Sequence, residues 1–216
     1  LASYWAAGGT WFILPSRGGA ARTVAWGWSE AVPVAGDFDG DGIADLAVYH
    51  PATGNWYIRT LLDQTLAFGL NWGFPSAVPV PGDYNADAAT ELAVYDTSRG
   101  VWHIQTLTGG MLALGTNWGF PGAAPVPGDY NNDRRTDLGV YDPRSGNWYL
   151  RTLAGAQLAW ATNWGFAGAV AVPGDYGGGA AADLAVYQPA AGRWYARTVG
   201  GTILLWNSSW GWSETQ

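Results

Sequence analysis

A unit of 46 residues repeats along the chain, and this spacing constrains the fold more than any single residue does. A Gly-Asp pair recurs with its aspartate at Asp37, Asp83, Asp129 and Asp175. A Trp-Gly pair recurs with its tryptophan at Trp26, Trp72, Trp118, Trp164 and Trp210. An aromatic pair begins at Trp11, Trp56, Trp102, Trp148 and Trp194, the first copy being displaced by one residue. A repeat of roughly 40–50 residues that carries short strands is typical of a β-propeller blade.

The second full copy shows how one repeat is built. Extended segments are expected at 77–81, 92–95, 101–107 and 111–118, separated by an acidic loop and by turns rich in Gly, Asp, Thr and Ser. Four strands joined in this way form an antiparallel sheet that is too small to be stable alone, so neighbouring sheets must stack on one another. We therefore expect an all-β β-propeller of five four-stranded blades, with one blade incomplete in this chain.

The blade boundaries follow from the phase of the repeat. We expect a single domain over 1–216, with a partial blade at 1–30 and full blades at about 31–76, 77–122, 123–168 and 169–216. Because residues 1–4 align with residues 46–49, the partial blade lacks its first strand and acidic loop. Residues 210–214 repeat the sequence of 26–30, so the C-terminal segment could close the ring against this gap. The alternative is that the chain is a piece of a longer repeat array.

Composition excludes several classes of function. The chain has no Cys, so disulfides and thiol chemistry are absent, and it has no apolar run long enough to insert into a membrane. The sequence shows no signal peptide and opens inside a repeat, so we expect any leader to lie elsewhere. The net charge is −7 and no basic stripe is found, so nucleic acid is not an expected partner. Most of the acidic residues lie in the loops after Gly-Asp, where clustered charge points to a bound cation.

The first acidic loop, Asp37 to Asp45, has the spacing of a metal site. Oxygen donors stand at its positions 1, 3, 5 and 9, position 7 can offer a backbone carbonyl, and Gly42 permits a sharp turn. Several carboxylates and a carbonyl suit Ca²⁺, which accepts six to eight oxygen ligands. The alternative is an acidic turn without an ion, in which the carboxylates would repel one another.

The second and third loops keep every donor position but replace the glycine by Ala88 and Arg134. In the fourth loop only Asp175 and Asp183 remain, and no metal is expected there. We therefore predict two or three structural Ca²⁺ sites. Their ligands would be Asp37, Asp39, Asp41, Ile43 and Asp45 in the first loop, Asp83, Asn85, Asp87, Ala89 and Glu91 in the second, and Asp129, Asn131, Asp133, Arg135 and Asp137 in the third, with Ile43, Ala89 and Arg135 acting through their carbonyls.

The stretch from Gly36 to Tyr49, Gly-Asp-Phe-Asp-Gly-Asp-Gly-Ile-Ala-Asp-Leu-Ala-Val-Tyr, resembles the FG-GAP or VCBS-type repeat of integrin-like propellers. The resemblance covers residues 31–199, is most specific in the first loop, departs at the fourth loop and is missing from the partial blade. It implies loops that bind Ca²⁺, an extracellular setting and a binding or adhesive role. Some fungal lectins share this type of blade, which makes carbohydrate one expected partner.

Candidate ligand-binding residues lie on the third and fourth strands of each repeat. Tyr and Arg two positions apart share one face of the third strand, and an Asn recurs on the fourth. An aromatic ring, a guanidinium and an amide could hold a sugar by stacking and hydrogen bonding. The candidates are Tyr57, Arg59, Asn71, Tyr149, Arg151, Asn163, Tyr195 and Arg197. The alternative is a polar ladder that supports the sheet, just as the Trp of each repeat is explained by packing between sheets.

Catalysis has little support, because neither histidine stands in a context that suggests a nucleophile and its base. We expect a secreted, calcium-stabilised binding module that recognises a glycan or an extracellular protein. The alternative is a structural protein that assembles with copies of itself or forms part of a longer array, since a bare sheet edge can accept a strand.

Overall fold

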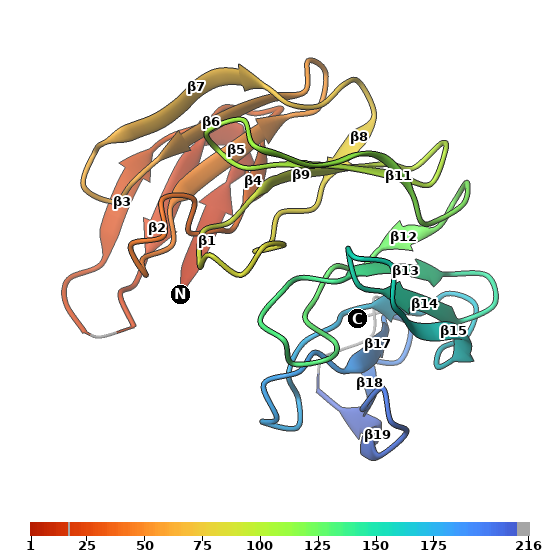
Figure 1. The fold of residues 1–216 in the computed structure, drawn as a ribbon. Coiled ribbons are helices and arrows are strands. Elements are labelled where there is room, and N and C mark those ends of the chain that lie inside the picture. Colours follow the sequence, from red (N-terminus) through yellow and green to blue (C-terminus); the bar gives the residue numbers. More distant parts are fainter. Residues whose placement is uncertain (17, 211–216) are drawn as a thin grey trace. The chain divides into compact units, whose positions relative to one another are not determined.

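The structure is a computed structural model and describes residues 1–16 and 18–210. Its strands form five antiparallel sheets, numbered here as blades 1 to 5 in chain order (Figure 1). Blade 1 contains β1 (Ala2–Trp5), β2 (Thr10–Ile13) and β3 (Arg22–Ala25), and a single turn of 3₁₀ helix, η1 (Ala6–Gly8), joins its first two strands. Blade 2 contains β4 (Val32–Val34), β5 (Leu46–His50), β6 (Asn55–Arg59) and β7 (Thr65–Asn71).

Blades 3 to 5 repeat the plan of blade 2. Blade 3 contains β8 (Ala77–Pro79), β9 (Leu92–Asp96), β10 (Val101–Gln105) and β11 (Met111–Asn117). Blade 4 contains β12 (Ala124–Pro125), β13 (Leu138–Asp142), β14 (Asn147–Arg151) and β15 (Gln157–Asn163). Blade 5 contains β16 (Val170–Ala171), β17 (Leu184–Gln188), β18 (Arg193–Arg197) and β19 (Ile203–Ser209). The predicted fold class, an all-β β-propeller of five blades, is confirmed.

Strand order follows sequence order in every sheet, as hairpin connections require. Among the described residues blade 1 has three strands, and β1 lies at its edge. In the other blades the matching strand is paired on both sides, for example β5 between β4 and β6. The predicted loss of one strand from blade 1 is therefore seen in the sheet. Residues 211–214, which complete the repeat of the Trp26 segment, lie outside the described residues.

Alternation along the third strand separates a buried face from a half-exposed one. In β6 the side chains of Trp56 and Ile58 are fully buried, whereas Asn55, Tyr57 and Arg59 are half-exposed. The indole Nε1–H of Trp56 donates to the carbonyl of Trp72 at 2.7 Å, and the same bond recurs from Trp102, Trp148 and Trp194 to the Trp 16 residues later. The Trp of the third strand is thus a packing residue that ties the start of β6 to the end of β7.

One close backbone approach requires glycine. Gly54, in the turn before β6, has φ of +75°, and a Cβ there would lie 2.1 Å from the carbonyl carbon of Gly73. The turn between the second and third strands can therefore pack directly against the segment that leaves the blade. Gly100 and Gly146 occupy the same place in blades 3 and 4.

By its contacts the chain divides into two compact units. The first contains 1–81, 87–96 and 103–114, and the second contains 82–86, 97–102 and 115–216. Apolar cores form where neighbouring sheets pack: Tyr49 and Trp56 of blade 2 join Leu92 and Val94 in the first unit, and blade 4 residues join Leu184 and Val186 in the second. Within the described part of the chain, no helix is long and apolar enough to cross a membrane.

Candidate metal loops and inter-blade grooves

The first acidic loop folds around its own carboxylates. Asp37 accepts backbone N–H bonds from Gly40 and Asp41 on Oδ1, at 2.8 and 3.2 Å, and from Gly42 on Oδ2 at 2.7 Å. Such bonds from successive N–H groups curl the backbone around the position-1 side chain. Ile43 donates its N–H to Asp41, and its half-exposed side chain has no oxygen. Its backbone carbonyl is therefore the only group of this residue that could bind a cation.

Three carboxylates of this loop converge. One oxygen from each of Asp37, Asp39 and Asp45 lies within 4.8 Å of the other two. Two oxygens that bind one Ca²⁺ ion at 2.3–2.6 Å can lie at most about 5 Å apart. The spacing therefore fits Ca²⁺, and Asp41 stands outside this group of three.

The carboxylate at position 9 is buried in every loop. Acidic side chains are rarely buried without a partner, yet all four position-9 residues are buried: Asp45, Glu91, Asp137 and Asp183. One oxygen of Asp45 accepts the N–H of Phe38, and Asp137 and Asp183 accept the N–H of Tyr130 and Tyr176 in the same way. The position-9 acid thus has a structural bond even in the fourth loop, where no metal is expected.

In the third loop, the second carboxylate oxygen of the position-9 residue distinguishes the loop from a turn that binds no ion. Asp137 Oδ1 is buried and has no hydrogen-bond partner among the described residues. The pKa of Asp137 is raised to about 7, chiefly by burial; the bond from the Tyr130 N–H lowers it, and the nearby carboxylates of Asp133 and Asp129 raise it. A buried carboxylate oxygen without a donor is costly unless a cation compensates it, so the donor set of this loop fits a metal.

The same forces act in the first loop. The pKa of Asp45 is raised to about 6, and burial is the largest cause. The hydrogen bond from the Phe38 N–H lowers this pKa, whereas the charges of Asp39, Asp37 and Asp41 raise it. In the fourth loop the pKa of Asp175 is instead lowered, chiefly by the N–H of Ala180. Backbone donors alone therefore satisfy the charge that remains in that loop.

The donors of the second loop are divided between the two units of the structure: Asp83 and Asn85 belong to the second, and Asp87, Ala89 and Glu91 to the first. Within each unit the local bonds match those of the first loop. Asp83 Oδ1 accepts the N–H of Ala86, and Asp87 Oδ1 accepts that of Ala89.

Each acidic loop is tied to the next repeat by a short backbone bond. The carbonyl of Asp37 accepts the N–H of Thr90, that of Asp83 the N–H of Thr136, and that of Asp129 the N–H of Ala182, all at 2.6 Å. Thr90 also accepts the N–H of Asp37 on its hydroxyl at 3.0 Å. An ion that orders one loop would therefore also order its junction with the following blade.

On the third strand, the predicted Tyr and Arg face the tryptophan of the preceding blade. The guanidinium carbon of Arg59 lies 5.5 Å from the ring centroid of Trp26. Arg151 lies 5.3 Å from Trp118, and Arg197 lies 5.6 Å from Trp164. These are cation–π contacts, and they place the candidate residues between blades.

Open grooves lie beside three of the tryptophans at this repeat position, Trp26, Trp72 and Trp164, and each groove is named here by the fourth-strand residue on its wall. The Phe68 groove, of about 310 Å³, lies between Trp26, Trp28 and Tyr57. The Leu114 groove, of about 240 Å³, is bordered by Trp72, Phe74 and His103. The Trp206 groove, of about 430 Å³, is bordered by Trp164, Phe166 and Tyr195. Their walls repeat at steps of 46 residues.

The predicted amides do not join the Tyr and Arg of their own blade. The side-chain amide of Asn71 donates to Asn55 Oδ1 and to the carbonyl of Thr53. Asn71 itself borders the Leu114 groove, beside the following blade. Asn163 bonds in the same way to Asn147 and borders the Trp206 groove. Each groove therefore draws its groups from two successive repeats.

Sequence reasoning missed four fourth-strand residues: Phe68, Leu114 and Trp206, which border the grooves, and Trp160 at the equivalent position. All are more than half exposed, and they also follow the 46-residue step. That spacing was the available signal, because a large apolar side chain at one strand position of every repeat indicates either packing or contact with a ligand. Their exposure shows that packing between sheets does not bury them.

No protein-family model matches this chain, and no curated protein matches it. Among solved structures, the chain is similar to the crystal structure of the V. cholerae biofilm matrix protein Bap1. The two share 19% sequence identity at a TM-score of 0.40, and the match covers 94% of this chain and 33% of that one. The chain thus spans about a third of the length of that protein. Membership of the FG-GAP or VCBS family stays a prediction.

Proposed function

We propose that this chain is an extracellular binding module, stabilised by Ca²⁺ in its acidic loops, that attaches to carbohydrate at several equivalent sites between blades. The observation that supports it most is the repeated stacking of Arg59, Arg151 and Arg197 on the tryptophan of the preceding blade. Each stack joins a planar donor to an aromatic ring, and two of these rings, Trp26 and Trp164, also border open grooves. Groups of this kind hold sugars by ring stacking and directed hydrogen bonds.

Repetition gives such a module its strength. A single shallow site binds a monosaccharide weakly, but several sites on one chain act together on a polymeric glycan and raise the overall affinity. The same multivalent binding would support an adhesive role. It needs many weak contacts with one extended ligand, and no chemical step.

Calcium has a supporting part in this proposal. Asp37, Asp39 and Asp45, with the equivalent residues of the second and third loops, would hold the ion. Bound there, the ion would supply the positive charge that the clustered carboxylates lack. The loops' own residues orient the junctions between blades, through bonds such as that from Thr90 to Asp37.

Glycan-array binding tests the proposal. We expect the chain to bind a set of neutral glycans, and the triple variant of Arg59, Arg151 and Arg197 to Gln to lose about tenfold or more in affinity, as expected when cation–π and directed contacts are removed at several sites. Arg144→Gln, an exposed arginine in a turn, is the matched control and should bind normally. Absence of glycan binding by the unaltered chain would reject the carbohydrate proposal.

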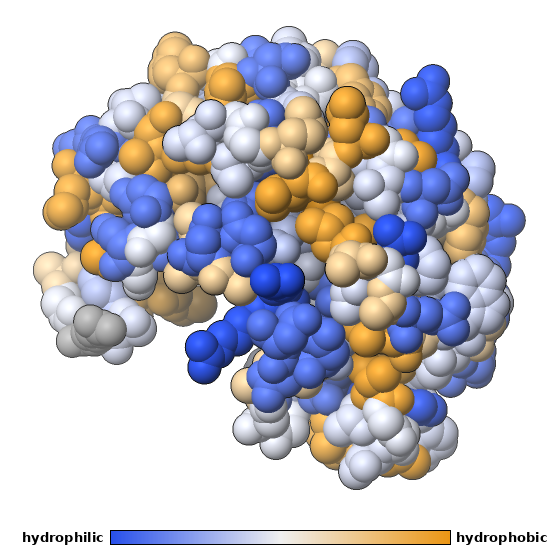
Figure 2. Space-filling model, in the orientation of Figure 1, coloured by the Kyte–Doolittle hydropathy of each residue, from blue (hydrophilic) through white to orange (hydrophobic). Residues whose placement is uncertain are grey.

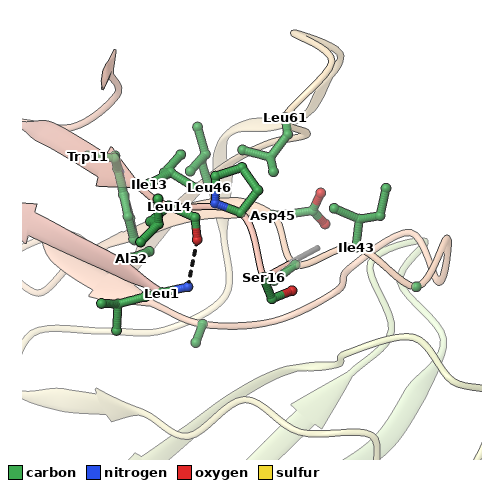
Figure 3. Close-up of a pocket in the computed structure, with 14 residues that line it drawn as sticks. Leu1, Ala2, Trp11, Ile13, Leu14, Ser16, Ile43, Asp45, Leu46 and Leu61 are labelled. Atoms are coloured by element: carbon green, nitrogen blue, oxygen red, sulfur yellow. Dashed lines mark hydrogen bonds between the residues drawn. The ribbon is translucent and has the colours of Figure 1, made fainter. Parts of the chain in front are cut away.

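One observation favours a second function, self-assembly. β1 is paired on one side only among the described residues, and a cavity of about 540 Å³ opens beside it (Figure 3). Its walls include Trp11, Ile13 and Leu14 of blade 1, with Ile43 and Leu46 of blade 2. An apolar cavity beside a free strand edge suits an added strand from a second copy. Growth of the particle mass with concentration, without glycan binding, would favour this function.

A further inference from the structure

The fourth strand of blades 2 to 5 presents one large apolar side chain to solvent at the same position of the repeat. Phe68, Leu114, Trp160 and Trp206 are spaced by 46 residues, and their exposed fractions are 77%, 69%, 61% and 65%. Burying such groups would ordinarily be favourable, so their regular exposure needs an explanation. On the face drawn in Figure 2, apolar residues reach the surface in several places between polar ones.

A backbone irregularity accompanies each of these residues. The residue that follows has positive φ in every blade: Gly69 at 72°, Gly115 at 70°, Ala161 at 50° and Asn207 at 54°. The pairing register shifts beside it in blades 2, 4 and 5. Bulges of this type redirect one side chain and are frequent beside binding sites. Ala161 keeps the left-handed conformation without being glycine, although this conformation is strained for residues that carry a Cβ.

The exposed rings are held in place. Trp160 packs on Tyr149 at 5.3 Å and on Trp118 at 5.8 Å, and Trp206 packs on Tyr195 and Trp164 at 5.5 and 5.8 Å. Phe68 makes the matching contact with Tyr57 at 5.2 Å. In all three pairs with Tyr the rings meet edge to face, at 86°. A ring held by its neighbours loses little entropy on binding, so it forms a rigid, open platform.

The chemistry around these platforms fits a neutral sugar. Stacking requires a ligand with an apolar face, and the nearby arginines favour hydrogen-bond acceptors at its rim, although Arg59 also pairs with Asp63 and Arg197 also donates to the carbonyl of Thr198. A pyranose has both. The net charge of −7 disfavours polyanions at long range, and grooves of 240–430 Å³ hold only small units.

We infer that Phe68, Trp160 and Trp206 are stacking platforms for hexopyranose units of a neutral polysaccharide, each completed by the Tyr and Trp rings that pack on it and by the Arg that stacks on that Trp. This assignment rests on the proposed carbohydrate-binding function. Leu114 marks the weakest site. It offers no ring, and its blade carries His103 and Gln105 where the others carry Tyr and Arg.

The Trp206 groove is the strongest site. It is the largest of the three measured grooves, and the indole Nε1–H of Trp164 is buried without a partner among the described residues. At the equivalent positions, Trp26 and Trp118 donate the same group to the carbonyls of Tyr57 and Tyr149. This donor is itself buried, so the size of the groove and its aromatic walls, Trp164, Phe166 and Trp206, support the ranking of this site.

The test measures binding of the full chain to soluble neutral polysaccharides (a β-glucan, an α-mannan and a galactan) and to an acidic uronate polymer, by calorimetry and affinity electrophoresis. Trp206→Ala should weaken binding to the preferred neutral polymer about tenfold, Trp160→Ala and Phe68→Ala somewhat less. Trp206→Phe should retain most of the affinity, and Leu114→Trp should increase it. Leu62→Ala, which removes an exposed apolar side chain in a turn outside the grooves, is the control and should bind normally.

The outcomes separate the two proposals. If the unaltered chain binds a neutral glycan and the three aromatic variants, folded by near-UV circular dichroism, bind it equally well, the platforms are rejected while the carbohydrate function stands. If no polysaccharide binds, both are rejected. Preference for the uronate polymer, or binding to a protein that depends on Trp206 without any glycan binding, would overturn the assignment of a neutral sugar.

Discussion

At the scale of single residues, position 6 of the acidic loops shows that the left-handed turn does not require glycine. Gly42 has φ of +84°, and Arg134, in the same position of the third loop, adopts +67°. Ala88 likewise has +72° in the second loop. Loss of the glycine therefore imposes a conformational cost on these loops without changing their path.

A reciprocal pair of substitutions measures that cost. A Cβ on Gly42 would meet no atom within 4 Å, so Gly42→Ala should destabilise the chain by about 1 kcal/mol through backbone conformation alone. Arg134→Gly should stabilise it by a similar amount, reduced by the greater freedom of glycine in the unfolded chain. Urea unfolding of both variants checks the two signs. Equal effects of the same sign would show that the turn is set by other residues.

At the scale of the element, most strands could be predicted because pattern and turn chemistry agree. The segments expected at 92–95 and 111–118 match β9 and β11 to within one residue. The third strand ends at Gln105, before the expected 107, because Thr106 already forms the turn: its N–H donates to the carbonyl of Gly110, and its hydroxyl accepts the Gly110 N–H. The convergence of Asp37, Asp39 and Asp45 in the first acidic loop could also be expected from the sequence, because the spacing of side chains within a short loop is a local property.

The grooves could not be predicted in the same way, because they depend on contacts between repeats. Arg59 and Asn71 belong to one repeat, yet Arg59 contacts the blade before it and Asn71 borders the groove of the blade after it. The bulges at Ala161 and Asn207 also interrupt the two-residue alternation that assigns side chains to faces. Exposure of Trp160 and Trp206 therefore emerges only from the folded sheet.

The acidic loops should make the stability of the calcium-free chain depend on pH. The pKa values of Asp45 and Asp137 are about 6 and 7 in the folded state, against an ordinary value of 3.8. Since the folded state holds these protons more tightly, their contribution to stability is complete below about pH 4 and is lost as the pH rises through 6 to 7. In chelator, the melting temperature should fall by a few degrees between pH 5 and pH 8.

Excess calcium supplies the control for this pH dependence. An ion bound only by ionised carboxylates gains affinity as they deprotonate, so in calcium the melting temperature should hold or rise over the same range. A chelated chain that is more stable at pH 8 than at pH 5 would contradict the raised pKa values of Asp45 and Asp137.

At the scale of the whole molecule, the acidic loops connect each repeat to the next, so calcium should act on global stability. The carbonyls of Asp37, Asp83 and Asp129 each accept a bond from the following repeat. An ion that binds only the folded loop stabilises the chain by mass action, about 1.4 kcal/mol for each tenfold excess over its dissociation constant. Chelation should therefore lower the melting temperature of the entire chain, and the shift should grow with calcium concentration.

The variants Asp37→Asn and Asp175→Asn form a matched pair for this effect, because both aspartates hold position 1 and both accept backbone N–H bonds from their own loop. Each substitution removes a charge and keeps an acceptor. Asp37→Asn should lose a large part of the calcium-dependent shift, since Asp37 belongs to the converging carboxylates, whereas Asp175→Asn should keep all of it. Calorimetric scans of both variants, with and without calcium, give the comparison. Equal calcium responses in the two would mean that the first loop binds no ion, and the stability of the repeat junctions would then rest on their backbone bonds alone.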